Sequence, residues 1–210
     1  MKFIDLTHPM RNGQASFPGD PPLKISPQAT IEKSRCNVSR LEMGSHQGTH
    51  LDALYHFIPD GKRLHEMPLD WFYGPATVLR IPKPPRADLT ITDFTPFEDR
   101  IVPGARIIYE TGWHRHYGEA DYFTDFPSLT QEAAAWLAGR RIRLLGMDTP
   151  TPGRDYYEVH HLLQQKPAEI VIVESLANLD RVPDDFLFIG FPLHFEGGDG
   201  SPIRAVAGVA

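Results

Sequence analysis

The sequence predicts one α/β domain over residues 1–210, with a mixed sheet, few helices and long proline-rich loops. A length of 210 residues suits a single domain with a sizeable core. Short runs rich in β-branched residues, Leu or Phe recur along the chain, and most are bounded by Gly or Pro. Proline accounts for 20 residues, about twice the usual share. Because 41% of the residues are apolar, we expect this proline to punctuate a packed domain rather than a disordered chain.

Seven short apolar runs separated by turn-forming residues are predicted to be strands. In chain order they are Val38–Met43, Ala76–Ile81, Arg106–Glu110, Ile142–Met147, Ile170–Val173, Phe186–Phe191 and Ile203–Val209.

Two helices are expected among these strands. The first covers Leu129–Gly139, which is rich in Ala. Ser128 and Gln131 have the spacing of a capping box, which satisfies free backbone N–H groups at a helix start. The second helix covers Glu158–Gln165. Gly197–Gly200 lies between two strand-like runs, and we interpret it as a hairpin turn rather than a phosphate-binding loop.

The composition excludes several classes of protein. A formal net charge of −6 gives no basic surface for nucleic acid. No apolar run approaches the roughly 18 residues of a membrane span, and Asp5 stands where a signal peptide needs apolar residues. The single cysteine, Cys36, excludes a disulfide framework and a cysteine-rich zinc module. Serine-hydrolase, Walker and dinucleotide-binding motifs are absent. We therefore expect a cytoplasmic protein with no nucleic-acid or membrane partner.

Ten histidines make metal binding the leading chemical hypothesis. His46, His50, Asp52 and His56 all occupy even positions, so an extended segment would place them on one face. Two histidines four residues apart would be separated by roughly 13 Å on a straight strand, so a shared ion requires a bend at Gly48. Imidazole and carboxylate are ordinary ligands of Zn²⁺ and Mn²⁺. The alternative is a hydrogen-bonded polar turn, and the spacing favours the metal site.

A second group of residues can complete such a site. His160 and His161 are adjacent, so their side chains point in different directions and at most one is expected to be a ligand. Glu174 follows an apolar strand, where it can be a ligand or a solvated strand end. His114 and His116 follow a loop-like segment, and we interpret them as non-ligands.

These segments resemble the cyclase family of metal-dependent hydrolases, which includes bacterial kynurenine formamidase and isatin hydrolase. The family motif His-x-Gly-Thr-His-x-Asp-Ala-Pro-x-His matches His46–His56, with Leu54 in place of the proline. Other matching segments run in the same order along nearly the whole chain: Ile4–Pro9, Phe17–Asp20, Leu144–Pro150, the region from His160 to Glu174, and Gly198–Arg204.

The resemblance implies a swivelling β/β/α-type fold and a centre holding one or two metal ions. The implied ligands are His46, His50, Asp52, His160 and Glu174. Asp52 would bridge two metals, His56 would transfer protons and Phe17 would line the substrate pocket. The fourteen-residue separation of His160 from Glu174 is longer than the family pattern, which leaves His161 as the alternative ligand. Phe17 replaces a Trp of kynurenine formamidase, so this position lacks the indole N–H donor.

The implied function is a metal-dependent amidohydrolase of the arylformamidase type, which converts the small molecule N-formylkynurenine to kynurenine and formate in tryptophan catabolism. The alternatives are hydrolysis of a cyclic amide or lactone, as in isatin hydrolase, and a catalytically silent metal-stabilised binding protein. The resemblance implies Zn²⁺, and the same ligands accept Mn²⁺. It also implies a homodimer or homotetramer.

Overall fold

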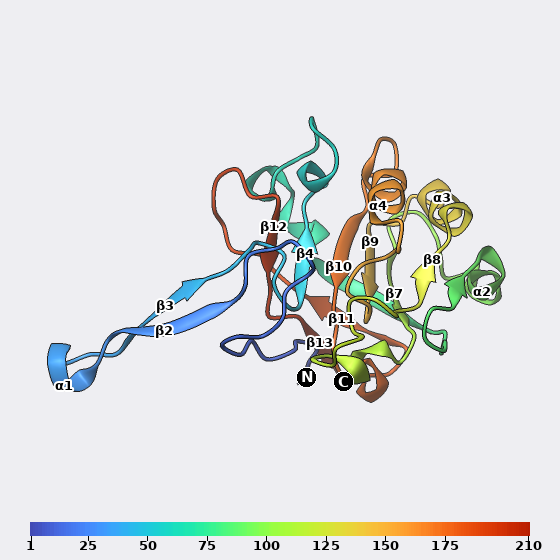
Figure 1. The fold of residues 1–210 in the computed structure, drawn as a ribbon. Helices are drawn as coiled ribbons and strands as arrows, with labels where there is room; N and C mark the ends of the chain where they lie inside the picture. Colours follow the sequence, from blue (N-terminus) through green and yellow to red (C-terminus); the bar gives the residue numbers. More distant parts are fainter.

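The computed structural model describes residues 1–210, which form a curled mixed sheet of nine strands, a group of helices and a projecting hairpin arm (Figure 1). The strand order across the sheet is β1 (Lys2–Asp5), β13 (Val206–Val209), β11 (Asp185–Ile189), β5 (Tyr73–Arg80), β7 (Arg106–Glu110), β9 (Leu144–Met147), β10 (Val171–Glu174), β4 (His50–Asp52) and β12 (Gly200–Pro202). The four strands from β5 to β10 run parallel, and the flanking pairs are antiparallel. The predicted α/β fold with a mixed sheet and few helices is confirmed.

The central strands are buried on both faces, because alternate side chains enter two different cores. On β10, Val171 and Val173 belong to a core of 22 residues, whereas Ile172 points into a second core of 19 residues. The second core lies under helices α3 (Gln131–Gly139) and α4 (Tyr156–Gln164). This arrangement makes β10 and α4 firmly packed elements, and both carry residues of the predicted metal site.

The remaining elements are short. They are α1 (Ile31–Ser34), α2 (Ile91–Phe94), the two-stranded sheet of β6 (Asp88–Leu89) and β8 (Ser128–Leu129), and six 3₁₀ turns: η1 (Leu54–His56), η2 (Leu64–Glu66), η3 (Leu69–Trp71), η4 (Thr95–Phe97), η5 (Trp113–His116) and η6 (Leu179–Arg181). None of the helices has the length and hydrophobicity needed to cross a lipid bilayer.

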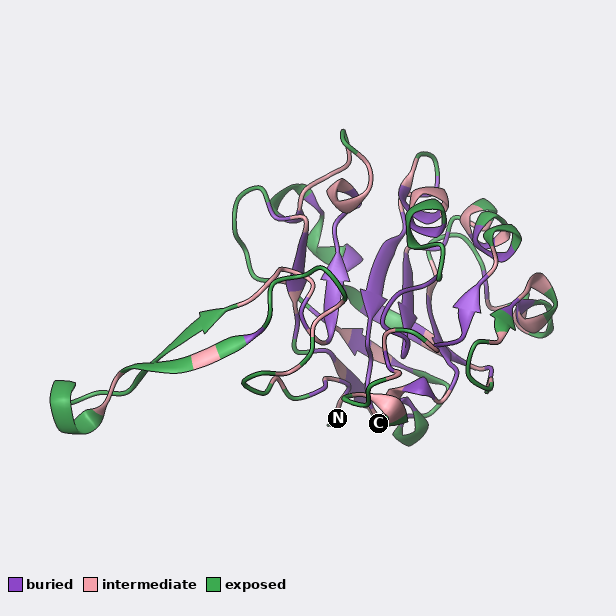
Figure 2. Cartoon of the chain, viewed as in Figure 1, coloured by how far each residue is buried: buried purple, intermediate pink, exposed green.

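A long hairpin arm projects from the body, formed by β2 (Lys24–Ala29) and β3 (Val38–Glu42) with α1 at its tip (Figure 1). Almost all of its residues are exposed (Figure 2). The sequence predicted β3 but not its partner. Because β2 packs on no core, it carries no alternating apolar pattern by which it could be recognised.

Three details of the predicted secondary structure are wrong. Helix α3 begins two residues later than expected, because Thr130 rather than Ser128 accepts the capping hydrogen bond, from the Ala133 N–H at 3.2 Å. The predicted strand Ile203–Val209 forms a strand only over β13 (Val206–Val209), and the three residues before it are the connection from β12. Gly197–Gly200 is not a hairpin turn, because β12 pairs with β4 instead of the preceding strand β11.

Candidate metal centre

The sheet brings the sequence motif and Glu174 together. Strand β4 pairs with β10 so that His50 lies opposite Glu174, and with β12 so that Asp52 lies opposite Gly200. The expected bend occurs at Gly48, which has a φ of +66° that favours glycine. The bend returns His46 towards Asp52, and the two side chains are 2.8 Å apart from Nδ1 to Oδ1.

The even spacing suggested an extended motif, but the motif is extended over only part of its length. Only His50–Asp52 is a strand, and His56 lies on the following 3₁₀ turn η1. The turn brings the His56 ring onto the His46 ring, with centroids 3.8 Å apart and planes 26° from parallel. His56 thus lies beside the other motif residues because the chain folds back, and not because they share a strand face.

Two groups of donor atoms converge at Asp52. In each group all ligand atoms lie within 4.8 Å of one another; the groups are His46, His50 and Asp52, and Asp52, His160 and Glu174. His50 Nε2 lies 3.3 Å from Glu174 Oε2, and His160 Nε2 lies 3.2 Å from Glu174 Oε1 and 3.3 Å from Asp52 Oδ2. His161 belongs to neither group and lies beside Tyr157 instead.

The donor set suits a divalent cation. Asp52 Oδ2 is buried, and its one close polar neighbour, His160 Nε2, lies outside good hydrogen-bond geometry, which is costly for a carboxylate unless a cation lies beside it. His50 and His160 each direct Nδ1 at a backbone carbonyl, of Gly48 at 2.9 Å and of Tyr156 at 2.6 Å. An Nδ1–H donated to these carbonyls leaves both Nε2 atoms free to bind a metal.

The charges of the site are consistent with this interpretation. Burial disfavours a charged imidazole, yet hydrogen bonds to carboxylates raise the pKa of both His46 and His160 to about 9. Burial also opposes ionisation of Asp52, but hydrogen bonds from His160 and its other histidine neighbours hold its pKa well below the usual value. The buried carboxylates thus favour positive charge between the rings, and a bound cation supplies that charge while displacing the protons.

A cavity of about 330 Å³ opens beside these residues. Its aromatic walls include Phe17, whose ring meets Phe123 edge-on at 6.1 Å and Tyr156 at 6.0 Å between centroids. Phe57 stacks on His160 at 4.2 Å and lines the same cavity. Of these aromatic residues only Phe17 could be predicted from the sequence, because the others stand in segments with no local motif.

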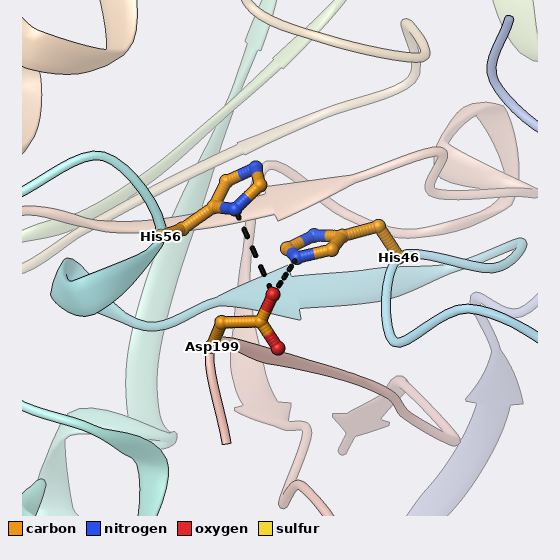
Figure 3. Close-up of side chains that lie close together, drawn as sticks. All are labelled: His46, His56 and Asp199. Carbon is orange, nitrogen blue, oxygen red and sulfur yellow. Dashed lines mark hydrogen bonds and ion pairs between the residues drawn. The ribbon is translucent and has the colours of Figure 1, made fainter. Parts of the chain in front are cut away.

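His56 also lines the cavity and differs from the other motif histidines in its charge. Burial lowers the pKa of His56 to about 4, so its imidazole is neutral near pH 7 and able to accept a proton. Its Nδ1 lies 4.0 Å from Oδ2 of Asp199, which is also paired with His46 (Figure 3).

The second histidine pair of the sequence lies apart from the converging donors. His114 Nδ1 is 3.3 Å from Asp148, a buried carboxylate that also accepts hydrogen bonds from the backbone of Thr111 and Gly112. His116 stacks on Trp113. Neither histidine belongs to the groups of ligand atoms that converge at Asp52.

Known proteins share both this sequence pattern and this fold. The profile of the Cyclase family matches residues 4–154. The chain belongs to the cyclase family. This cyclase-family chain is 34% identical over 212 residues to the kynurenine formamidase of Bacillus mycoides (strain KBAB4), with 98% of the chain and 96% of that protein covered. The kynurenine formamidase of Bacillus anthracis has the same identity and coverage.

Solved structures give the same assignment. The cyclase-family chain superposes on isatin hydrolase A from Ralstonia solanacearum with a TM-score of 0.86 and 26% identity, covering 98% of this chain and 91% of that one. Isatin hydrolase A from Labrenzia aggregata, bound to benzyl benzoate, gives a TM-score of 0.86 and 27% identity, with 98% and 93% covered. The family resemblance of the sequence is confirmed: the chain is similar over almost its whole length to proteins named kynurenine formamidase and isatin hydrolase.

Proposed function

We propose that this cyclase-family enzyme is an arylformamidase that hydrolyses N-formylkynurenine to kynurenine and formate, a step of tryptophan catabolism. The observation that carries the proposal is the convergence of two donor groups on Asp52 beside a cavity with aromatic walls. The nearly full-length similarity to proteins named kynurenine formamidase supports the choice of substrate.

The proposed ligands of the first metal are His46, His50 and Asp52, and those of the second are Asp52, His160 and Glu174. We propose Zn²⁺, as one or two ions, with Mn²⁺ as the alternative for the same nitrogen and oxygen donors. A metal bound there supplies Lewis acidity and lowers the pKa of a bound water towards neutrality.

The protein's own residues then have three tasks. The neutral His56 imidazole takes the proton from the attacking water and delivers it to the leaving nitrogen of the formamide. Phe17, Phe123 and Tyr156 pack against the aryl ring and orient it. Phe17 contributes apolar contact without an indole N–H, so this side of the pocket orients the ring by shape.

The function is tested by incubating zinc-loaded protein with N-formylkynurenine, isatin and simple lactones. We expect kcat/KM to be highest for N-formylkynurenine. A preference for isatin or a lactone would favour the cyclic-amide alternative, which the 0.86 TM-score with isatin hydrolases supports. Turnover of none of these compounds by protein with bound zinc would favour the non-catalytic binding protein.

We also propose that the enzyme is a homodimer or homotetramer. The arm presents Ile31, Val38 and Leu41, with 59%, 46% and 51% of their surface exposed. Apolar side chains gathered on a ribbon outside the core are typical of an interface with another chain. Sedimentation of the intact protein should give at least twice the mass of one chain, and a monomer would contradict this assembly.

A further inference from the structure

Asp199 lies at the edge of the candidate metal centre, immediately before β12, and contacts two of its histidines (Figure 3). Its Oδ2 is 3.2 Å from His46 Nε2 and 4.0 Å from His56 Nδ1. The sequence around Asp199 predicts only a turn, with no role for its carboxylate.

The geometry of His46 differs from that of the other histidines in the site. His50 and His160 face the neighbouring carboxylates through Nε2, and backbone carbonyls occupy their Nδ1 atoms. His46 faces Asp52 through Nδ1, so its outward nitrogen is Nε2. The acceptor paired with that outward nitrogen is a side chain, the carboxylate of Asp199.

The backbone around Asp199 also holds the His46 ring in place. The Ala53 N–H donates to the Asp199 carbonyl at 2.9 Å, and Gly200 lies opposite Asp52 in the β12–β4 pair. A Cβ on Gly200 would come within 2.4 to 2.9 Å of three His46 ring atoms, so the ring lies directly against this backbone. The hydrogen-bond ladder that places Asp52 therefore also places the Asp199 carboxylate.

We propose that Asp199 is a positioning residue that accepts the Nε2–H of His46, keeps Nδ1 of that ring free for the metal, and fixes the ring against which His56 stacks. The inference rests on the proposed ligand role of His46. A carboxylate that accepts the distal N–H of a ligating histidine sets its tautomer and orientation, and losing it typically costs about 10- to 100-fold in metal affinity or activity.

The test compares Asp199→Ala and Asp199→Asn with Glu196→Gln, a control that removes an exposed carboxylate from the same loop. Zinc affinity is measured by competition with a chromophoric chelator. We expect Asp199→Ala to weaken zinc binding about 10- to 100-fold. Asp199→Asn keeps an acceptor oxygen, so its loss should be smaller than that of the Ala variant, and Glu196→Gln should bind zinc as the wild type does. Wild-type zinc affinity in Asp199→Ala would overturn the proposal.

A second measurement needs no variant at position 199 and so does not depend on whether one folds. Nitrogen-15 spectra of the zinc-loaded wild-type protein should show His46 coordinated through Nδ1, with its proton on Nε2. Coordination through Nε2 would overturn the proposal.

Failure of the proposed function gives a different result. If the wild type does not hydrolyse N-formylkynurenine but Asp199→Ala loses zinc affinity and Nδ1 of His46 is coordinated, Asp199 retains its positioning role. If His46→Ala binds zinc as tightly as the wild type, His46 is not a ligand and the positioning role is excluded.

Discussion

Replacing His8 by Phe should make the stability of the protein less sensitive to acid. The His8 ring is 9% exposed and stacks on Tyr117 with centroids 3.7 Å apart and planes 3° from parallel. Its Nε2 is buried without a hydrogen-bond partner. Burial lowers the pKa of His8 from 6.5 to about 4, with His114 adding to the decrease and Asp148 opposing it. The folded protein therefore keeps this ring neutral over a pH range in which the unfolded chain protonates it.

The sign and size of the effect follow from this difference. Because the unfolded chain binds the proton more tightly, the free energy of unfolding falls as the pH drops below 6.5 and levels off below about 4. A fall of the pKa from 6.5 to about 4 corresponds to about 3 kcal/mol in total, of which about 2 kcal/mol is lost by pH 5. Phe keeps the stacking surface and has no proton to gain.

The assay is urea unfolding of the metal-free protein at pH 7 and pH 5. Between these values the wild type should lose about 2 kcal/mol more stability than His8→Phe. His194→Phe removes an exposed histidine and serves as the control. An equal loss of stability in the wild type and in His8→Phe would show that His8 does not remain neutral in the folded state, and the reasoning would be refuted.

Three further predictions concern the metal centre and its pocket. His56→Ala should lower kcat by about 10²- to 10⁴-fold while zinc content, measured by atomic absorption, stays unchanged; loss of zinc would instead make His56 a ligand. Phe17→Ala should reduce kcat/KM for N-formylkynurenine about tenfold or more while a small aliphatic formamide is less affected, because an aryl ring loses packing area; equal losses for both substrates would contradict this role. Removing zinc with a chelator should lower Tm by about 5–11 °C relative to protein in zinc at 100 times Kd. Zinc at that concentration adds about 2.7 kcal/mol to the free energy of unfolding. An unchanged Tm would argue against a site formed only in the folded state.

Local patterns were sufficient for the parts of this molecule that pack on a core. The apolar runs that became β7 and β10 are visible because both faces of these strands are buried. The motif histidines were recognised for a similar reason, since their spacing is local. Pairing between distant segments has no such signal. Strand β12 joins β4 across about 150 residues, so nothing near Gly197 indicated that the expected hairpin turn was wrong.

The same limit explains what was missed at the candidate site. Asp199 contacts His46 only because β12 lies beside β4, and Phe123 reaches Phe17 from a segment more than 100 residues away. Phe123 stands in a stretch of sequence that is ordinary for a loop, and the family match over Gly198–Arg204 assigned no role to Asp199. Their proximity to the motif is a product of the fold, and a single sequence carries no local record of it.

The arm is joined to the pocket through the chain, because its two legs continue directly into residues that line the pocket. The leg that leads into β2 carries Phe17–Asp20, and the leg that leaves β3 continues to His46–Gly48. The two legs are tied at their base, where the Ser16 hydroxyl donates a hydrogen bond to Oε1 of Gln47 at 2.5 Å. The arm and this part of the pocket wall are therefore one continuous stretch of chain, so a partner bound to the arm would hold a segment that also shapes the pocket.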